Sequence, residues 1–142
     1  MLCDVANSTA IAKELGFQHG DVVQEWMWDD DVDDSIRQSI QDETGEEIAD
    51  EDWDGGPDGA IIWWRDGDDE DTLSDTIVDA STVLDDDAPF WILTPKPGRE
   101  GAASSFTIRS AAKTAGMNIE QPLTISQNWI AIRLLRFGGH EN

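Results

Sequence analysis

The sequence predicts a single α/β domain, a three-layer Rossmann-like arrangement with a mainly parallel sheet. Strand-like apolar runs alternate with segments of helical periodicity, which is typical of a parallel sheet covered by helices. The last two strand-like segments follow each other too closely for a helical crossover, so they predict a C-terminal antiparallel hairpin. The length of 142 residues suits one domain over residues 1–142. We expect about five strands, an ordered core over about residues 8–137 and a flexible tail over 138–142.

The first helix and the first strand are short. Ser8 or Thr9 can cap a helix that Gly16 ends, because hydroxyls satisfy free amides at a helix start and glycine adopts the left-handed closing conformation. Residues 22–28 are β-branched and aromatic, which favours a strand. Since side chains alternate along a strand, we expect Trp26 and Trp28 to share one face.

A second helix should follow the acidic run Asp29–Asp34. Apolar side chains recur there at four-residue spacing, at Val32, Ile36 and Ile40. Carboxylates before them can cap the helix and complement its positive end. Gly45 is expected to end this helix.

The second half of the chain supplies the remaining strands and helices. Residues 46–59 form a polar connection that contains glycine and proline. Four apolar runs are typical of strands: 60–64, 89–94, 117–126 and 129–137. Helical patterns cover 72–84 and 104–115. We expect most tryptophans to lie in the core, with Trp63 and Trp64 pointing to opposite faces of their strand.

Acidic residues are concentrated in the middle of the chain. Residues 29–87 hold 24 of the 31 Asp and Glu but only two bases, a formal charge of −22, whereas residues 88–142 carry +3. This charge disfavours nucleic acid and anionic membranes as ligands and favours a basic protein or cations. Adaptation to high salt is an alternative explanation of the acidity. It should, however, also place acidic residues in the C-terminal third, which is mildly basic.

Several functional classes lack their sequence signals. No apolar run approaches the roughly 18 residues of a membrane span, and the first residues have no secretory-signal pattern. Cys3 is the only cysteine, which excludes an internal disulfide. His19 and His140 belong to no catalytic motif, and no phosphate loop is present. We therefore expect a cytoplasmic protein with no catalytic residues and no cofactor.

Metal binding is an alternative for two acidic segments. Asp29, Asp31 and Asp33 could converge on one ion if they lay in a loop, although an acidic helix start explains them more simply. Residues 50–55 match the opening of a calcium loop, but Ile61 stands where that loop needs glutamate. We expect no metal site.

Acidic side chains and one tryptophan form the first candidate site, a docking surface for a basic protein. Trp53 lies among acids in a loop, where it either anchors a partner, as tryptophan often does at interfaces, or covers the sheet. The expected contact residues are Asp29, Asp30, Asp31, Asp33, Asp34, Trp53, Asp68 and Asp69.

The loop over residues 95–101 is the second candidate site, for an anionic ligand. It should follow a central strand, at the sheet edge where open α/β sheets bind ligands. The loop contains two cationic side chains and a glycine that permits close approach to the backbone. Two bases on the next helix could enlarge this basic patch. The expected residues are Lys96, Gly98, Arg99, Arg109 and Lys113. The simpler interpretation is an ordinary strand-to-helix loop with solvated bases.

The order of elements is similar to a shortened class I methyltransferase-like sheet. That fold also starts with a helix, a Gly-Asp turn (here Gly20-Asp21) and a strand, and it ends with a glycine-led hairpin (here from Gly116). In methyltransferases a glycine-rich turn after the first strand lets the backbone approach the cofactor. Here that turn reads Trp28-Asp29-Asp30-Asp31, so the resemblance implies the fold and not methyl transfer.

A narrower resemblance covers about residues 10–137. Its blocks are Leu15-Gly16, Gly20 to Glu25, Trp28 to Asp34, Thr44 to Glu47, Trp63 to Asp66, Leu93 to Gly101 and Thr114 to Gly116. In combination they resemble a bacterial family catalogued as domain of unknown function 3052. The resemblance implies a small stand-alone bacterial protein and no particular activity.

The sequence therefore favours a non-enzymatic acidic binding or regulatory protein. We expect it to dock a basic protein surface through residues 29–87, with no direct binding of nucleic acid and no membrane contact. The alternative is a small-anion or nucleotide-binding protein, or an enzyme, that uses the loop of Lys96 and Arg99. A subunit of a larger assembly is a third interpretation, and no residue pattern favours one oligomeric state.

Overall fold

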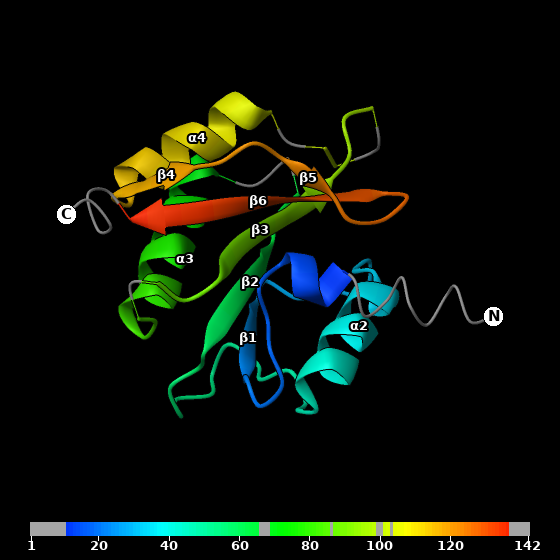
Figure 1. The fold of residues 1–142 in the computed structure, drawn as a ribbon. Coiled ribbons are helices and arrows are strands. Elements are labelled where there is room, and N and C mark those ends of the chain that lie inside the picture. The colour runs from blue at the N-terminus through cyan, green and yellow to red at the C-terminus, as the bar shows by residue number, and fades with distance from the viewer. Residues whose placement is uncertain (1–10, 66–68, 86, 99–100, 103, 137–142) are drawn as a thin grey trace.

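The computed structural model describes residues 11–65, 69–85, 87–98, 101–102 and 104–136. They form a sheet of order β1-β2-β3-β6-β4, in which β5 also pairs with β6 (Figure 1). The strands are β1 (Val23–Trp26), β2 (Gly59–Trp63), β3 (Phe90–Pro95), β4 (Met117–Ile119), β5 (Leu123–Thr124) and β6 (Trp129–Arg136). Since β1, β2 and β3 are parallel and β6 is antiparallel to its neighbours, the predicted α/β class is confirmed.

Helices cover both faces of the sheet. They are α2 (Asp34–Thr44), α3 (Glu70–Thr82) and α4 (Ser105–Thr114), and residues 11–14 are also helical. Figure 1 shows α2 on one side of the sheet and α3 with α4 on the other. Three layers result, as the alternation of strands and helices predicts.

Each face of the sheet has its own apolar core. On the α2 side Trp63 packs edge-on against Trp129, with ring centroids 4.9 Å apart. On the side of α3 and α4 Trp64 packs among residues of both helices. The prediction that Trp63 and Trp64 point to opposite faces is confirmed.

Local signals fix both ends of α2. The Asp33 carboxylate accepts a hydrogen bond from the Ser35 amide at 3.0 Å and caps the helix start. Gly45 adopts the left-handed conformation, with φ of 77°, and its amide donates to the Gln41 carbonyl. The predicted acidic cap and glycine end of this helix are therefore confirmed.

The strand that ends near residue 28 differs from the prediction. β1 stops at Trp26 because Met27 has φ of 61°, a conformation outside the extended region. Trp26 packs against the core below α3 and α4, whereas Trp28 is 53% exposed and lies beside Glu25 on the α2 side. The prediction that Trp26 and Trp28 share one face was wrong, since the turn at Met27 breaks the alternation.

The predicted strand over 117–126 is divided into β4 and β5. The ladder continues to the Glu120 amide, which donates to the Arg133 carbonyl at 3.1 Å, and then breaks. Pro122 lies in the break and has no amide hydrogen to donate to β6. Both short strands still pair antiparallel with β6, so the predicted hairpin is present.

Candidate functional site

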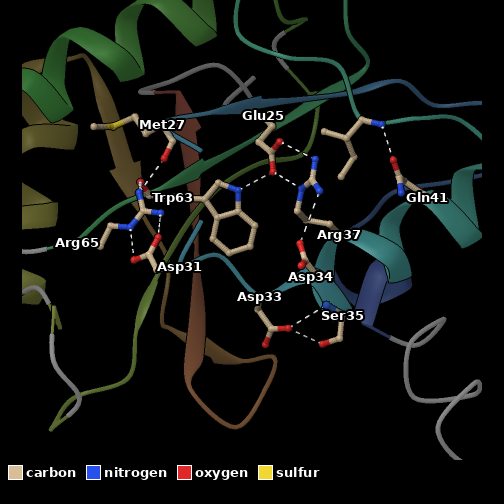
Figure 2. Close-up of polar contacts among 11 residues, drawn as sticks. Glu25, Met27, Asp31, Asp33, Asp34, Ser35, Arg37, Gln41, Trp63 and Arg65 are labelled. Carbon is tan, nitrogen blue, oxygen red and sulfur yellow. Dashed lines mark hydrogen bonds and ion pairs between the residues drawn. The ribbon is translucent and has the colours of Figure 1, made fainter. Parts of the chain in front are cut away.

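A partly buried ion pair lies beside β1, on its α2 side. The Glu25 side chain is 5% exposed and accepts hydrogen bonds from Arg37 Nε at 2.8 Å and Arg37 Nη2 at 3.1 Å. The Trp63 indole donates to the same carboxylate at 2.8 Å (Figure 2). The hydrogen bonds to Glu25 raise the pKa of the Arg37 guanidinium. Because three donors face Glu25, its charge is compensated inside the protein.

A cavity of about 300 Å³ opens beside this ion pair. Its lining residues are Glu25, Trp28, Arg37, Asp50 and Glu51. We call it the Trp28 cavity. Trp28 follows β1, and Asp50 and Glu51 come from the connection between α2 and β2, so three separate segments meet there.

Backbone contacts place that connection along the outer edge of β1. The Glu25 amide donates to the Ala49 carbonyl at 2.8 Å, and the Ala49 amide donates to the Val23 carbonyl at 2.9 Å. The Glu51 carboxylate accepts from the Met27 amide at 3.1 Å. These bonds satisfy backbone groups that an edge strand would otherwise expose, and they fix Glu51 beside Trp28.

A second ion pair connects the carboxyl ends of β1 and β2. Arg65 Nε and Nη2 donate to the Asp31 carboxylate, the former at 2.9 Å. Arg65 Nη1 donates to the carbonyl of Met27 at 2.7 Å and to that of Trp63 at 3.0 Å (Figure 2). Arg37 and Arg65 are the two bases of residues 29–87, so each base of the acidic stretch is paired with a carboxylate.

The predicted docking acids have different environments. Asp31 pairs with Arg65, Asp33 caps α2, and the carboxylate of Asp34 lies 3.7 Å from Arg37 Nη1. Asp29 and Asp30 are exposed, and the hydrogen bond from the Asp30 amide lowers the pKa of Asp29. The two acids that remain most available to a partner in this run are therefore Asp29 and Asp30.

The remaining predicted docking residues lie apart from this run. Asp69 is exposed at the start of α3, and Asp68 lies outside the described residues. Trp53 is 37% exposed, and its ring lies so close to Gly55 that a Cβ there would be 2.2 Å away. Trp53 lines a different cavity, together with Glu46 and Glu47.

The acidic stretch is continuous in sequence but not on the surface. Its helices α2 and α3 cover opposite faces of the sheet (Figure 1). Asp29 and Asp30, which follow β1, lie at the same sheet edge as Lys96, which follows β3, because carboxyl ends of parallel strands share an edge. The acidic stretch therefore does not form one face remote from the Lys96 loop.

The predicted anion loop follows β3, an inner strand between β2 and β6. The Lys96 amide donates to the Asn128 carbonyl at 2.8 Å, and Gly98 has φ of 89° with open space around it. Arg109 and Lys113 are exposed on α4, one turn apart. Arg99 lies outside the described residues.

Three buried polar groups belong to residues near the carboxyl ends of the parallel strands. Among the described residues, Trp26 Nε1, Trp64 Nε1 and Thr94 Oγ1 have no hydrogen-bond partner. Trp26 and Trp64 pack on the side of α3 and α4, and Thr94 shares that face because it alternates with Leu93 on the other. Each of these indole and hydroxyl groups remains able to hydrogen-bond to water or to an acceptor.

Sequence reasoning missed most residues of the Trp28 cavity. Glu25 carried a signal, because a carboxylate inside an apolar strand needs a partner. Arg37 carried another as one of two bases in an acidic stretch. The exposure of Trp28 depends on the turn at Met27, for which the sequence has no glycine signal.

Two further features are absent from the described ranges. No group of three or more His, Cys, Asp or Glu is placed there to hold a metal ion. None of the helices described there is long and apolar enough to cross a membrane.

Comparisons with other proteins identify relatives in sequence. A family model described as "Protein of unknown function (DUF3052)" matches residues 12–137. Uncharacterized proteins of Mycobacterium tuberculosis (strain ATCC 25618 / H37Rv) and Mycobacterium bovis (strain ATCC BAA-935 / AF2122/97) are each 42% identical over 125 residues, 88% of this chain and 77% of the relative. These relatives are bacterial.

Several solved structures with a similar fold are methyltransferases. The mitomycin 7-O-methyltransferase MmcR matches with a TM-score of 0.64 and 10% identity over 94% of this chain, which spans about half (54%) of that enzyme. A SAM-dependent methyltransferase from Aquifex aeolicus matches with a TM-score of 0.54 and 10% identity, covering 89% of this chain and 88% of that one. At these identities the similarity shows a methyltransferase-like Rossmann fold, as predicted, and nothing about activity.

Proposed function

The chain belongs to the family described as "Protein of unknown function (DUF3052)", and we propose that it is an acidic binding protein that docks a basic surface of another protein. The proposal makes it a non-enzymatic, regulatory protein of the cytoplasm. Its contacts would come from exposed acids within the stretch over residues 29–87. No catalytic residue forms part of the proposal.

The observation that carries this proposal is the pairing of both bases in the acidic stretch. Arg37 is paired with Glu25 and Arg65 with Asp31, and these two bases face 24 acids of the same stretch. A formal net charge of −22 over residues 29–87 therefore remains after both bases are counted. Such a field attracts basic partners over a distance of about 10 Å at ordinary ionic strength, and salt weakens it.

The methyl donor named for the similar enzymes does not fit the residues found here. Open α/β sheets bind ligands in the crevice at the carboxyl ends of their strands. At the carboxyl ends of β1 and β2 the Arg65 guanidinium donates to Met27, Trp63 and Asp31. The turn after β1 carries acids in place of glycine, so the proposal includes no methyl transfer.

Affinity capture with the full chain from a lysate of its native host tests the proposal. The expected result is a basic protein that binds at low salt and is released as salt increases. A variant with Asp29→Asn and Asp30→Asn should capture less of it. The matched control carries Glu14→Gln and Glu120→Gln, which remove two exposed charges outside the acidic stretch. Capture that does not respond to salt would contradict the proposal.

A second candidate function is binding of a small acceptor-rich ligand at the sheet edge. Its support is the group of unpartnered buried atoms on Trp26, Trp64 and Thr94, beside which Lys96 leaves β3. A thermal-shift screen with nucleotides and inorganic phosphate tests it. A ligand of this site should raise the melting temperature, and Lys96→Ala should reduce the shift; a screen without any shift excludes these ligand classes.

A further inference from the structure

The Trp28 cavity combines three kinds of surface in one small space. One wall is the Glu25–Arg37 pair, a second is the half-exposed indole of Trp28, and a third is formed by Asp50 and Glu51. Its volume of about 300 Å³ is at the lower limit for small-molecule pockets, so it suits a single side chain better than a larger ligand.

The charge inside the cavity is negative despite the presence of Arg37. Glu25 accepts two hydrogen bonds from Arg37, so this pair is close to neutral. Glu51 uses one oxygen to accept from the Met27 amide, and Asp50 uses one to accept from the Asp52 amide at 3.0 Å. Within the described residues the second oxygen of each carboxylate has no hydrogen-bond donor, so two carboxylates remain able to accept from a cation.

The aromatic wall selects among cations. A guanidinium stacks on an aromatic face and pairs with carboxylates through a planar fork of donors, whereas an ammonium is a compact and strongly hydrated charge. Trp28 is 53% exposed, an unusual position for a residue that is normally buried, and carboxylates lie beside it. An arginine side chain therefore matches the cavity better than a lysine.

We propose that the Trp28 cavity binds one arginine side chain of the partner protein, with its guanidinium over the Trp28 indole and paired with Glu51 and Asp50. The inference rests on the proposed function, which it makes specific. The Glu25–Arg37–Trp63 contacts form the rigid base of this pocket, and the backbone bonds of residues 49–51 to β1 fix its acidic wall.

The experiment is a titration of the ¹⁵N-labelled full chain with a short peptide that carries one arginine, acetyl-Gly-Gly-Arg-Gly-Gly-amide. Nuclear magnetic resonance should show shifts of the Trp28 indole and of the amides of residues 50–51. A peptide with citrulline in place of arginine has nearly the same shape without charge and should not bind. A lysine peptide should bind about two- to fivefold more weakly.

Matched variants distinguish binding in the Trp28 cavity from attraction by the general negative field. Trp28→Ala should weaken binding of the arginine peptide about two- to fivefold, whereas Phe106→Ala removes an exposed aromatic ring of α4, outside the acidic stretch, and should have little effect. Glu51→Gln keeps an acceptor for the Met27 amide and should also weaken binding about two- to fivefold. Glu47→Gln removes an equal charge outside the cavity and should change affinity less.

The outcomes distinguish this inference from the proposed function. Equal effects of Trp28→Ala and Phe106→Ala, or peptide shifts spread over the acidic surface, would overturn the arginine pocket while salt-sensitive capture of a basic partner could still succeed. Absence of any binding by the arginine peptide would overturn it as well. A localised, arginine-selective response would support the pocket even if lysate capture failed.

Discussion

At the scale of single residues, the position of Glu25 determines the local chemistry. A carboxylate that is 5% exposed in a strand is costly to charge unless donors face it, and here Arg37 and Trp63 supply them. The pair therefore does not enlarge the outward acidic field. It shapes the cavity beside Trp28 instead.

Substitution Arg37→Met should lower the free energy of unfolding by about 3 kcal/mol. Removing one partner leaves the Glu25 charge buried with the Trp63 indole as its remaining donor. This loss of stability lies at the lower end of the range for breaking a buried ion pair, because the Arg37 side chain is 29% exposed. Urea denaturation measures the change, and Arg109→Met, an exposed site on α4, is the control with an expected change near zero. A loss as small as the control's would show that Glu25 is stable without Arg37.

At the scale of elements, the ends of α2 depend on two residues with local roles. Asp33→Ala should cost about 1 kcal/mol of stability, because the Ser35 amide loses its acceptor. Asp30→Ala removes an equal charge from an exposed position and should cost much less. Chemical denaturation of both variants measures the free energy of unfolding. Equal losses of stability would show that the effect comes from charge alone and not from the cap.

At the C-terminal end of α2, we expect substitution of Gly45 to cost more stability than the loss of the Asp33 cap. Gly45→Ala should cost about 1–2 kcal/mol because φ is 77°, a conformation that L residues with a Cβ disfavour. An added Cβ would also lie 3.1 Å from His19 Cε1. Gly20→Ala has similar backbone strain, with φ of 92°, but meets nothing within 4 Å. Thermal denaturation should therefore rank Gly45→Ala below Gly20→Ala in stability, and the reverse order would contradict the role of His19.

Sequence reasoning predicted these elements because their signals are local. The cap at Asp33, the glycine at 45 and the apolar strand runs each act within a few residues of themselves. The errors have local causes that the patterns do not contain: the left-handed Met27 redirects Trp28, and Pro122 divides the predicted strand.

The candidate site was less predictable because it is made of long-range contacts. Arg65 meets Asp31 across 34 positions of sequence, and Glu25 meets Trp63 across 38. The charge of the region was visible in composition, but which carboxylates are paired internally depends on the order of β1 and β2 in the sheet. Thus the sequence indicated the acidic character of the site and not the Trp28 cavity.

At the scale of the whole molecule, acids lie on both faces of the sheet around α2 and α3. A formal net charge of −22 opposes compaction through self-repulsion. Raising sodium chloride from about 0.01 M to about 0.5 M should therefore increase the melting temperature by several degrees, because screening shortens the range of repulsion to about 4 Å. Calorimetry measures this, and a melting temperature that falls with salt would contradict the account.

The most direct test of the central claim is the salt at which host proteins leave the immobilised full chain. The account predicts a basic protein that is retained near 0.05 M salt, is released by about 0.5 M, and is released earlier from the Asp29→Asn, Asp30→Asn variant than from the Glu14→Gln, Glu120→Gln control. Retention that is equal at both salt concentrations, or no retained protein at all, would contradict it.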